Sequence, residues 1–481
     1  MKNGLAPINR IPPEVLTLIP DSWDRRYRDE DIIALTHVCR VWREIFVSRS
    51  SLWTELEYVN AAKTRVYLER SKLSPIDLWV QRDEGLAPDD PFLEIDPHTI
   101  RRLGSLFIHA TSENLQDITT RLPHHAPLLK SLIILTEGEF EPQLNPVVTT
   151  ELFRGDLSSL RELHLSSIRT ELPWRNMVAL TSFNLTNTPP GDISIKQLLD
   201  FLEGAPYLRE IHLHSVPLAF GDQGGRLVSL VSLKSLTING EQPTSPLLGH
   251  LLVPVGADLH TVLVSPGPRI EDHLPSSLDN LRNLSGFTQL RLRLSERYST
   301  VCFTGPNGEV NMDSISSGVD TAGLVLGFLA KFDTSTANQL KIIHSYPLSE
   351  VLLCRALLPM KNLSALTISR SKTFHSFIHA LGPNTNSSNT LICPKLEELV
   401  LRIGRRDVFD VESVVGMAVA RASRGAKLNS VRVVNLGKPV PVDVSELGKH
   451  VLRVEYCCKD SGDVGDDSDG DEYSEYSDEE G

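Results

Sequence analysis

One spaced pattern of apolar residues, apolar-x-x-apolar-x-apolar, recurs along most of the chain. Its alternating part predicts a β-strand with one buried face, and segments between the patterns, such as 195–202, can form helices. Nine triplets begin between residues 73 and 287, about every 27 residues, and three more follow. A single unit of this kind cannot bury its apolar edge, so the pattern predicts a stacked array with a continuous core. The triplets are Leu73/Ile76/Leu78, Leu103/Leu106/Ile108, Leu129/Leu132/Ile134, Leu160/Leu163/Leu165, Leu180/Phe183/Leu185, Leu208/Ile211/Leu213, Leu233/Leu236/Ile238, Leu259/Val262/Val264, Phe287/Leu290/Leu292, Leu363/Leu366/Ile368, Leu396/Leu399/Leu401 and Leu428/Val431/Val433.

The array is interrupted after residue 297. Residues 298–304 and 309–312 predict a hairpin around the turn sequence at 305–308, and a helix is expected at 321–332. A helix at 60–72 precedes the array, and residues 451–454 predict a closing strand. We therefore expect one α/β repeat region over residues 60–457.

Residues 8–55 have a different, helical pattern. Apolar positions from Ile11 to Ile19 predict a first helix that Pro20 ends, and a charged loop follows. A second helix is predicted at 31–47, with two apolar stripes that together cover about half of its circumference. Either its own domain buries both stripes, or one stripe is kept for a partner. The stripes are Ile32, Leu35, Cys39, Trp42 and Phe46, and Ala34, Val38, Val41 and Ile45.

The elements Ile-Pro-Pro-Glu-Val-Leu, Leu-Thr-His-Val-Cys-Arg-Val-Trp-Arg-Glu-Ile and Ser-Leu-Trp-Thr in this stretch resemble an F-box of the type common in fungal F-box proteins. The resemblance implies a small all-helical F-box at residues 8–56 that docks the Skp-type adaptor of a cullin–RING (SCF) ubiquitin ligase. Leu52 and Trp53 match the closing element, whereas residues 20–22 depart from the usual apolar turn. The adaptor contacts that the resemblance implies are Ile11, Pro12, Leu16, Ile19, Val38 and Trp42.

The array resembles an irregular leucine-rich-repeat solenoid of parallel strands and helices. Regular repeats have Asn or Cys three residues after the triplet, and this chain instead has Ile168, Thr188, Val216, Glu241, Ser371 and Gly404 there. An ordinary α/β sandwich with leucine-rich strands is the alternative. Strand positions that alternate with the apolar ones are the candidates for binding a substrate protein: Glu162, His164, Asn184, Glu210, His212, Thr237, Arg291, Thr367 and Arg432.

The net charge of −13 is unevenly placed. Residues 459–481 contain eleven acidic side chains and one lysine, and their low hydrophobicity predicts a disordered acidic tail. Ser468 and Ser477, each with an acidic residue three positions later, are phosphorylation candidates, although a solubilising role of the tail is favoured over a regulatory one. The remaining chain is nearly neutral, so we expect no nucleic-acid partner.

Six cysteines without paired spacing indicate a reducing compartment. The N-terminus lacks the apolar run of a signal peptide, and the longest nearly apolar stretch, 322–330, is too short to span a bilayer. These features predict an intracellular protein, in the cytoplasm, the nucleus or both, with no membrane partner.

The sequence contains no catalytic motif that we can identify. His164 and His212 occupy equivalent positions, for which a solvated strand face is a better explanation than a metal site, and we expect no metal and no cofactor. The sequence and the two resemblances predict a non-enzymatic substrate-recognition subunit of an SCF ligase. One alternative is a scaffold that uses its F-box outside a ligase. Another is an enzyme with an unrecognised site at 298–345.

Overall fold

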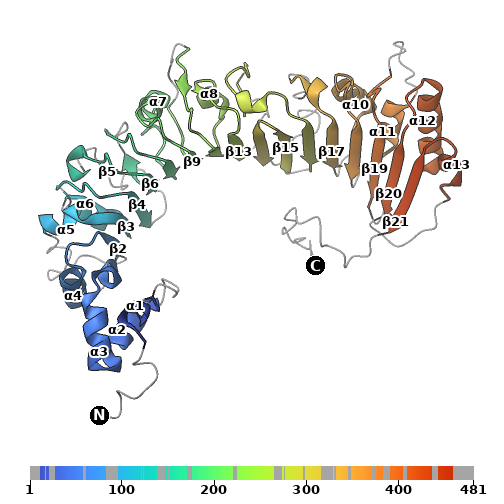
Figure 1. Cartoon of the computed structure of the whole chain (residues 1–481). Helices are drawn as coiled ribbons and strands as arrows, with labels where there is room; N and C mark the ends of the chain where they lie inside the picture. Colours follow the sequence, from blue (N-terminus) through green and yellow to red (C-terminus); the bar gives the residue numbers. More distant parts are fainter. Residues whose placement is uncertain are drawn as a thin grey trace, which may run out of the picture. The chain divides into compact units, whose positions relative to one another are not determined.

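The computed structural model of the chain is mixed α/β, with mostly parallel strands. It divides into two compact units, Met1–Gly240 with His250–Val253, and Glu241–Gly249 with Pro254–Gly481 (Figure 1). In the part of the chain that the structure describes, no helix is long and apolar enough to cross a membrane. The described residues are 11–16, 18–20, 28–57, 61–82, 96–120, 122, 124–137, 147–148, 152–170, 176–219, 221, 225–264, 273–275, 277–295, 298–315, 329, 332–344, 348–369, 374–382, 391–404, 409–435 and 443–458.

The first unit begins with three helices, α1 (Pro13–Leu16), α2 (Arg28–Val38) and α3 (Arg40–Ser48). The prediction of one helix at 31–47 was wrong, because Cys39 is extended (φ −160°, ψ 172°) and separates α2 from α3. The Arg43 guanidinium donates to the carbonyl oxygen of Thr36 at 2.9 Å. In a continuous helix that oxygen would accept the amide of Arg40, so the Arg43 side chain replaces a bond lost at the break.

Trp53 joins these helices to the strands. It lies in the short helix η5 (Ser50–Trp53), is fully buried, and its indole nitrogen donates to the Phe46 carbonyl oxygen at 2.9 Å. Its ring meets Tyr67 of α4 (Ala61–Ser71) edge-on, and the Arg70 guanidinium lies 4.3 Å from the ring centroid. The predicted helix at 60–72 is thus present as α4.

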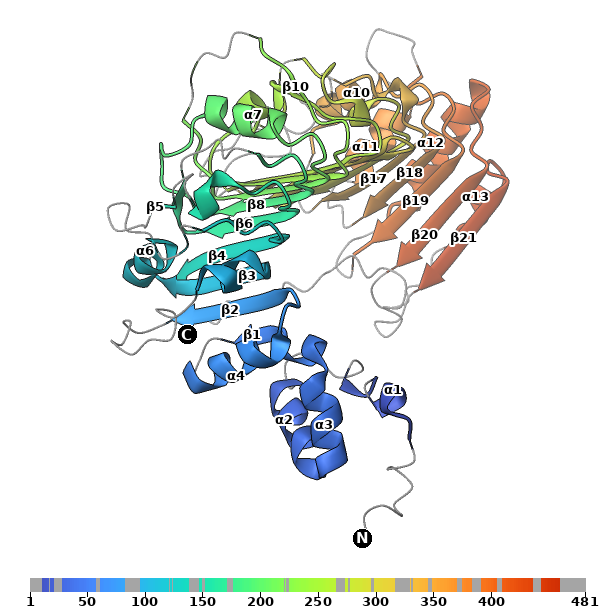
Figure 2. The ribbon, with the colours of Figure 1, turned by 60° about the vertical axis from the view of Figure 1, so that its left-hand side comes forward.

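Eight strands of the first unit pair in parallel in chain order, with additional pairings of the short strands β5 (Val147–Val148) with β7 (Arg169–Thr170) and β10 (Val228–Ser229) with β12 (Leu251–Leu252). Figure 2 shows β2 to β8 side by side. The second residues of the triplets pair in one row from Leu106 to Leu236, and their side chains form the core. The eight strands are β1 (Glu55–Glu57), β2 (Ile76–Arg82), β3 (Leu103–Thr111), β4 (Ser131–Glu137), β6 (Glu162–Ser166), β8 (Ser182–Thr186), β9 (Glu210–His214) and β11 (Ser235–Gly240). The helices between them are α4, α5 (Pro97–Arg101), α6 (Ser112–Thr120), η7 (Leu152–Gly155) and α7 (Ile195–Glu203).

The first predicted triplet was out of register. Leu73 is 76% exposed, and Leu78 pairs with Leu106 rather than with the position of Ile108. The pairing skips Gly104: Ile76 is the partner of Leu103, and the next residue, Asp77, is the partner of Ser105. A bulge of this kind inserts one residue into a strand, which a fixed spacing cannot anticipate.

Backbone hydrogen bonds close the bends after β6, β8 and β9. Ser167, Asn187 and Ser215 have positive φ, near 50–56°. Their amides donate to the carbonyl oxygens of Thr186, His214 and Asn239 on the next strand. Backbone bonds from left-handed residues therefore connect successive repeats at this edge of the sheet.

The strands of the second unit run in the order β13, β16, β15, β14, β17, β18, β19, β20 and β21. The predicted hairpin, β15–β16, is confirmed, and it lies in the plane of the sheet between β13 and β14. Figure 1 shows α10, α11 and α12 on one side of the later strands. The elements are α8 (Ser245–Leu248), β13 (Asp258–Val264), η9 (Arg282–Leu284), β14 (Gln289–Leu294), β15 (Tyr298–Gly305), β16 (Gly308–Ile315), η10 (Thr334–Thr336), β17 (Gln339–His344), α10 (Glu350–Leu357), β18 (Ala365–Ser369), α11 (Phe374–Leu381), β19 (Glu398–Ile403), α12 (Val411–Ser423), β20 (Ser430–Asn435), α13 (Ser445–Gly448) and β21 (Arg453–Cys458).

The hairpin turn requires glycine at both ends. Gly308 has φ +122°, and a Cβ there would lie 2.7 Å from the Ala257 carbonyl oxygen. A Cβ on Gly305 would lie 2.8 Å from the Cα of Phe287. Both separations are too short for real side chains, so the two glycines allow the turn to pack against neighbouring backbone.

Two details of the second unit differ from the prediction. In β13 the buried residues are Leu259, Thr261 and Leu263, so the predicted inward positions Val262 and Val264 face the other way. Strand β17 was missed because its repeat starts with a small residue, Ala337, instead of leucine. The closing strand predicted at 451–454 is present as β21, which begins two residues later and extends to Cys458. Most of the helix predicted at 321–332 and the whole tail at 459–481, with Ser468 and Ser477, lie outside the described residues.

The inward Thr261 is accommodated by a buried histidine. Its hydroxyl lies 2.8 Å from Nδ1 of His273, which is fully buried, and burial lowers the pKa of His273 to about 4. The nearby Asp313 carboxylate opposes this shift but is the smaller influence. His273 therefore stays neutral at pH values where an exposed histidine takes up a proton.

Lowering the pH from 7 to 5 should destabilise the second unit through His273. Above about pH 6.5 the imidazole is neutral in both the folded and the unfolded chain; below it only the unfolded chain takes up the proton until the folded pKa is reached. The free energy of unfolding should fall by about 2 kcal/mol by pH 5 relative to a His273→Gln variant. Urea unfolding of both proteins at the two pH values measures this difference, and an equal fall in both would contradict it.

Candidate partner-binding surfaces

In the first unit, side chains that alternate with the buried ones form an outward face of the sheet. Four predicted binding residues meet there: His164, Asn184, His212 and Thr237 pair in register across β6, β8, β9 and β11. They line an open hollow of about 520 Å³. The other lining residues are Leu135, Ser166, Thr186, Leu213, His214 and Asn239. The hollow therefore offers imidazole, amide and hydroxyl groups, and none of its lining residues is Lys, Arg, Asp or Glu.

Burial lowers the pKa of His164, and the neighbouring His212 adds to this effect, whereas Glu162 opposes it. His164 is thus neutral at pH 7. The Thr186 hydroxyl donates to the amide oxygen of Asn184 at 3.0 Å. The NH2 group of Asn184 can then donate to an acceptor of a ligand. Such a surface suits hydrogen bonds to neutral polar groups.

The remaining predicted residues are also outward but lie elsewhere. Glu162 and Glu210 occupy the adjacent row at the start of their strands, and the Ser131 hydroxyl donates to Glu162 at 2.8 Å. Arg291, Thr367 and Arg432 belong to β14, β18 and β20 of the second unit. Arg432 forms an ion pair with Glu455 at 2.6 Å.

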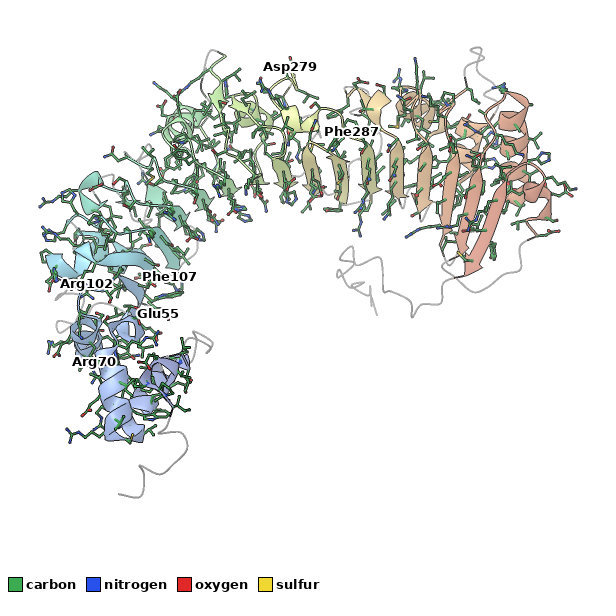
Figure 3. The ribbon with its side chains drawn as sticks, viewed as in Figure 1. Glu55, Arg70, Arg102, Phe107, Asp279 and Phe287 are labelled. Carbon is green, nitrogen blue, oxygen red and sulfur yellow. The ribbon has the colours of Figure 1, made fainter. Side chains whose placement is uncertain are left out.

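Sequence reasoning missed an aromatic pair on the outward face of the first unit. Trp79 of β2 is 50% exposed and its ring stacks on Phe107 of β3. Figure 3 labels Phe107, together with Glu55 of β1, at this end of the sheet. The available signal was the alternation itself, because Trp79 lies between the inward Leu78 and Val80.

The six residues assigned to adaptor contact differ in exposure. Leu16 and Trp42 are buried, Ile11 and Ile19 are partly buried, and Pro12 and Val38 are exposed. The buried stripe of α2 and α3 is completed by Ile32 and Phe46, and the Trp42 and Phe46 rings meet edge-on with centroids 5.7 Å apart. Other large apolar side chains are exposed on α1, on the turn after it, on α2 and on α3: Val15, Leu18, Ile33 and Val41, respectively.

A cluster of titratable groups surrounds the hairpin of the second unit. Nε2 of His260 lies 2.9 Å from one carboxylate oxygen of Asp313, and the Tyr298 hydroxyl donates to the other at 2.9 Å. Burial favours the neutral form of Asp313, but hydrogen bonds led by that from His260 outweigh it and lower the pKa of its carboxyl. These contacts connect β13, β16 and β15, which gives the cluster a structural role.

The described residues include no group of three or more His, Cys, Asp and Glu side chains placed to hold a metal ion. A comparison with known protein families found no matching family, and a comparison with curated proteins found no matching relative.

Proposed function

We propose that this protein is the substrate-recognition subunit of an SCF-type cullin–RING ubiquitin ligase. An F-box at residues 8–56 docks a Skp-type adaptor, and a degenerate leucine-rich-repeat solenoid at 60–457 holds a substrate protein. Ubiquitin transfer belongs to other subunits, so the chain is not itself an enzyme, and it works in the cytoplasm, the nucleus or both. The parallel, in-register strands support the solenoid assignment.

One observation carries the adaptor proposal: the two apolar stripes of the N-terminal helices differ in burial. Ile32, Trp42 and Phe46 are buried, whereas Val38 and Val41, on either side of the break at Cys39, are 53% and 59% exposed. Exposed aliphatic side chains grouped on a short helical segment are typical of a surface that a partner covers. The exposed stripe is therefore the docking face.

Replacing Val38 by aspartate should abolish adaptor binding without unfolding the helices. A carboxylate placed in an apolar interface loses its hydration, and a loss of even ~3 kcal/mol weakens binding more than a hundredfold. The dissociation constant of a purified Skp-type adaptor, measured by interferometry on the full-length chain, tests this. Val231→Asp is the matched control, since Val231 is a 72% exposed valine outside the N-terminal helices.

Undiminished adaptor binding by a folded Val38→Asp protein would rule out this face. Failure of the unaltered chain to bind any Skp-type adaptor would rule out the ligase function. The second candidate, a scaffold outside a ligase, is favoured by the same exposed stripe, because an apolar partner of another kind could cover it. Co-purification of cullin with the adaptor-bound chain separates the two, since a scaffold would not recruit cullin.

A further inference from the structure

The outward face of β1, β2 and β3 places an exposed indole ring beside carboxylates. The rings of Trp79 and Phe107 are 4.7 Å apart and inclined by 29°. Phe107 is the register partner of Trp79 on β3, and Glu57 is its register partner on β1. Phe107 thus covers one face of the indole ring, and the opposite face is turned to the strand that carries Glu57.

Two further acidic residues lie next to this position. Asp77 is two residues before Trp79 on the same face of β2, and its register partner on β1 is Glu55. The outward positions of the eight parallel strands of the first unit, as far as the structure describes them, include no Lys or Arg. The carboxylates of Glu55, Glu57 and Asp77 therefore lie on β1 and β2 beside Trp79.

Basic residues near the starts of the neighbouring strands lie farther along the sheet or are buried. Lys130, Arg161, Arg209 and Lys234 directly precede β4, β6, β9 and β11, farther along the sheet. Arg102, which precedes β3, is buried, and its guanidinium donates to the Ser74 carbonyl oxygen and the Ser71 hydroxyl. Trp79 thus lies at an end of the outward face whose described outward residues include carboxylates and no Lys or Arg.

From this arrangement we infer that the open face of Trp79 binds an arginine or lysine side chain of an extended polypeptide segment. The face of an indole attracts a cation through its quadrupole, and the carboxylate of Glu57, the register partner of Trp79, adds a charge-assisted hydrogen bond. The identification of the segment as part of the substrate protein rests on the proposed function. The cation-binding surface itself rests on the residues of β1 to β3.

The rest of the outward face specifies the residues that come after the cation in the bound segment. Beyond Phe107 the same row continues with Ile133 on β4 and then with His164 and Asn184 in the hollow. With strands about 4.8 Å apart, Asn184 is roughly 19 Å from Trp79, which about six extended residues span. The segment should therefore carry its cation first, an apolar residue two or three positions later, and neutral polar residues near the sixth.

A fluorescein-labelled decapeptide, Gly-Arg-Gly-Leu-Ala-Gly-Ser-Asn-Ser-Gly, tests this on the full-length chain. Its partner peptide contains citrulline, the uncharged isostere, in place of arginine. Fluorescence polarisation should give at least tenfold tighter binding of the arginine peptide, and the difference should shrink at high salt because the carboxylates are screened. Equal affinities for the two peptides, or no binding of either up to about 1 mM, would overturn the inference.

Three variants locate the site. Trp79→Ala and Glu57→Lys should each remove the preference for arginine, and Trp79→Phe should keep part of it because an aromatic face remains. Glu398→Lys is the matched control: it reverses the charge of an exposed acidic strand residue in the second unit and should keep the preference. Preference retained in Glu57→Lys would place the cation elsewhere.

The result is independent of adaptor docking. Trp79 is outside the N-terminal helices, so Trp79→Ala should bind the Skp-type adaptor as the unaltered chain does. If the unaltered chain bound the adaptor but showed no preference for the arginine peptide, this inference alone would be overturned. Arginine-selective binding by a chain that binds no Skp-type adaptor would overturn the proposed function alone.

Discussion

Replacing Leu163 by aspartate should unfold the first unit. Leu163 is 1% exposed and pairs with Leu132 and Phe183 in the central row of the core. Removing a buried leucine side chain costs about 2–5 kcal/mol, and an unpaired buried carboxylate adds several more. Together these are comparable to the whole stability of an ordinary domain, about 5–15 kcal/mol.

Hydrogen exchange of the amides in β3 to β11 measures the unfolding of Leu163→Asp, because protection of these amides depends on the paired strands. Glu162→Gln is the control: Glu162 is the exposed neighbour of Leu163, and its replacement should change the free energy of unfolding by no more than about 0.5 kcal/mol. A soluble Leu163→Asp protein with normal protection would show that the strand faces are assigned the wrong way round.

Replacing Arg421 by methionine should destabilise the second unit by about 3 kcal/mol. Arg421 of α12 is fully buried, and its guanidinium donates to the carbonyl oxygens of Ile392 at 2.9 Å and Cys393 at 2.7 Å, with a longer contact to Leu381. Methionine fills similar space but donates no hydrogen bond. Each buried carbonyl left without a donor costs about 1–3 kcal/mol.

Removing a buried charge recovers part of that loss, which is why the expected value is below the sum for all three carbonyls. Burial also lowers the pKa of Arg421, in keeping with an environment that disfavours the charge. Urea unfolding compares Arg421→Met with Arg424→Met, an exposed arginine one turn later. If the two variants were equally stable, the carbonyl contacts would contribute nothing.

Most strand positions could be predicted from sequence because burial on one face leaves a period-two signal that survives irregular spacing. The failures have local physical causes. Near Leu73 the apolar residues can be grouped as Leu73/Ile76/Leu78 or as Ile76/Leu78/Val80. The bulge at Gly104 sets the register in which the second group is buried. In β13, the inward Thr261 looks polar in sequence, and only its contact with His273, twelve residues later, makes its burial acceptable.

The candidate site was predictable to a similar degree. Alternation correctly placed His164, Asn184, His212 and Thr237 on one face, and stacking of their strands joined them in one hollow. Spacing alone could not show that Trp79 and Phe107 stack, because that depends on the register between β2 and β3. It also could not reveal the break at Cys39, where the side chain of Arg43 replaces a backbone donor.

The hairpin within the second unit has a consequence for the order in which the chain folds. The parallel neighbours β17 and β18 are connected by 20 residues, whereas β14, β15 and β16 are separated by loops of three and two residues. Closing a tenfold shorter loop forfeits about 2 kcal/mol less chain entropy. These three antiparallel strands can therefore pair before any parallel neighbour, and they give the second unit a local nucleus to which β13 and β17 add from opposite sides.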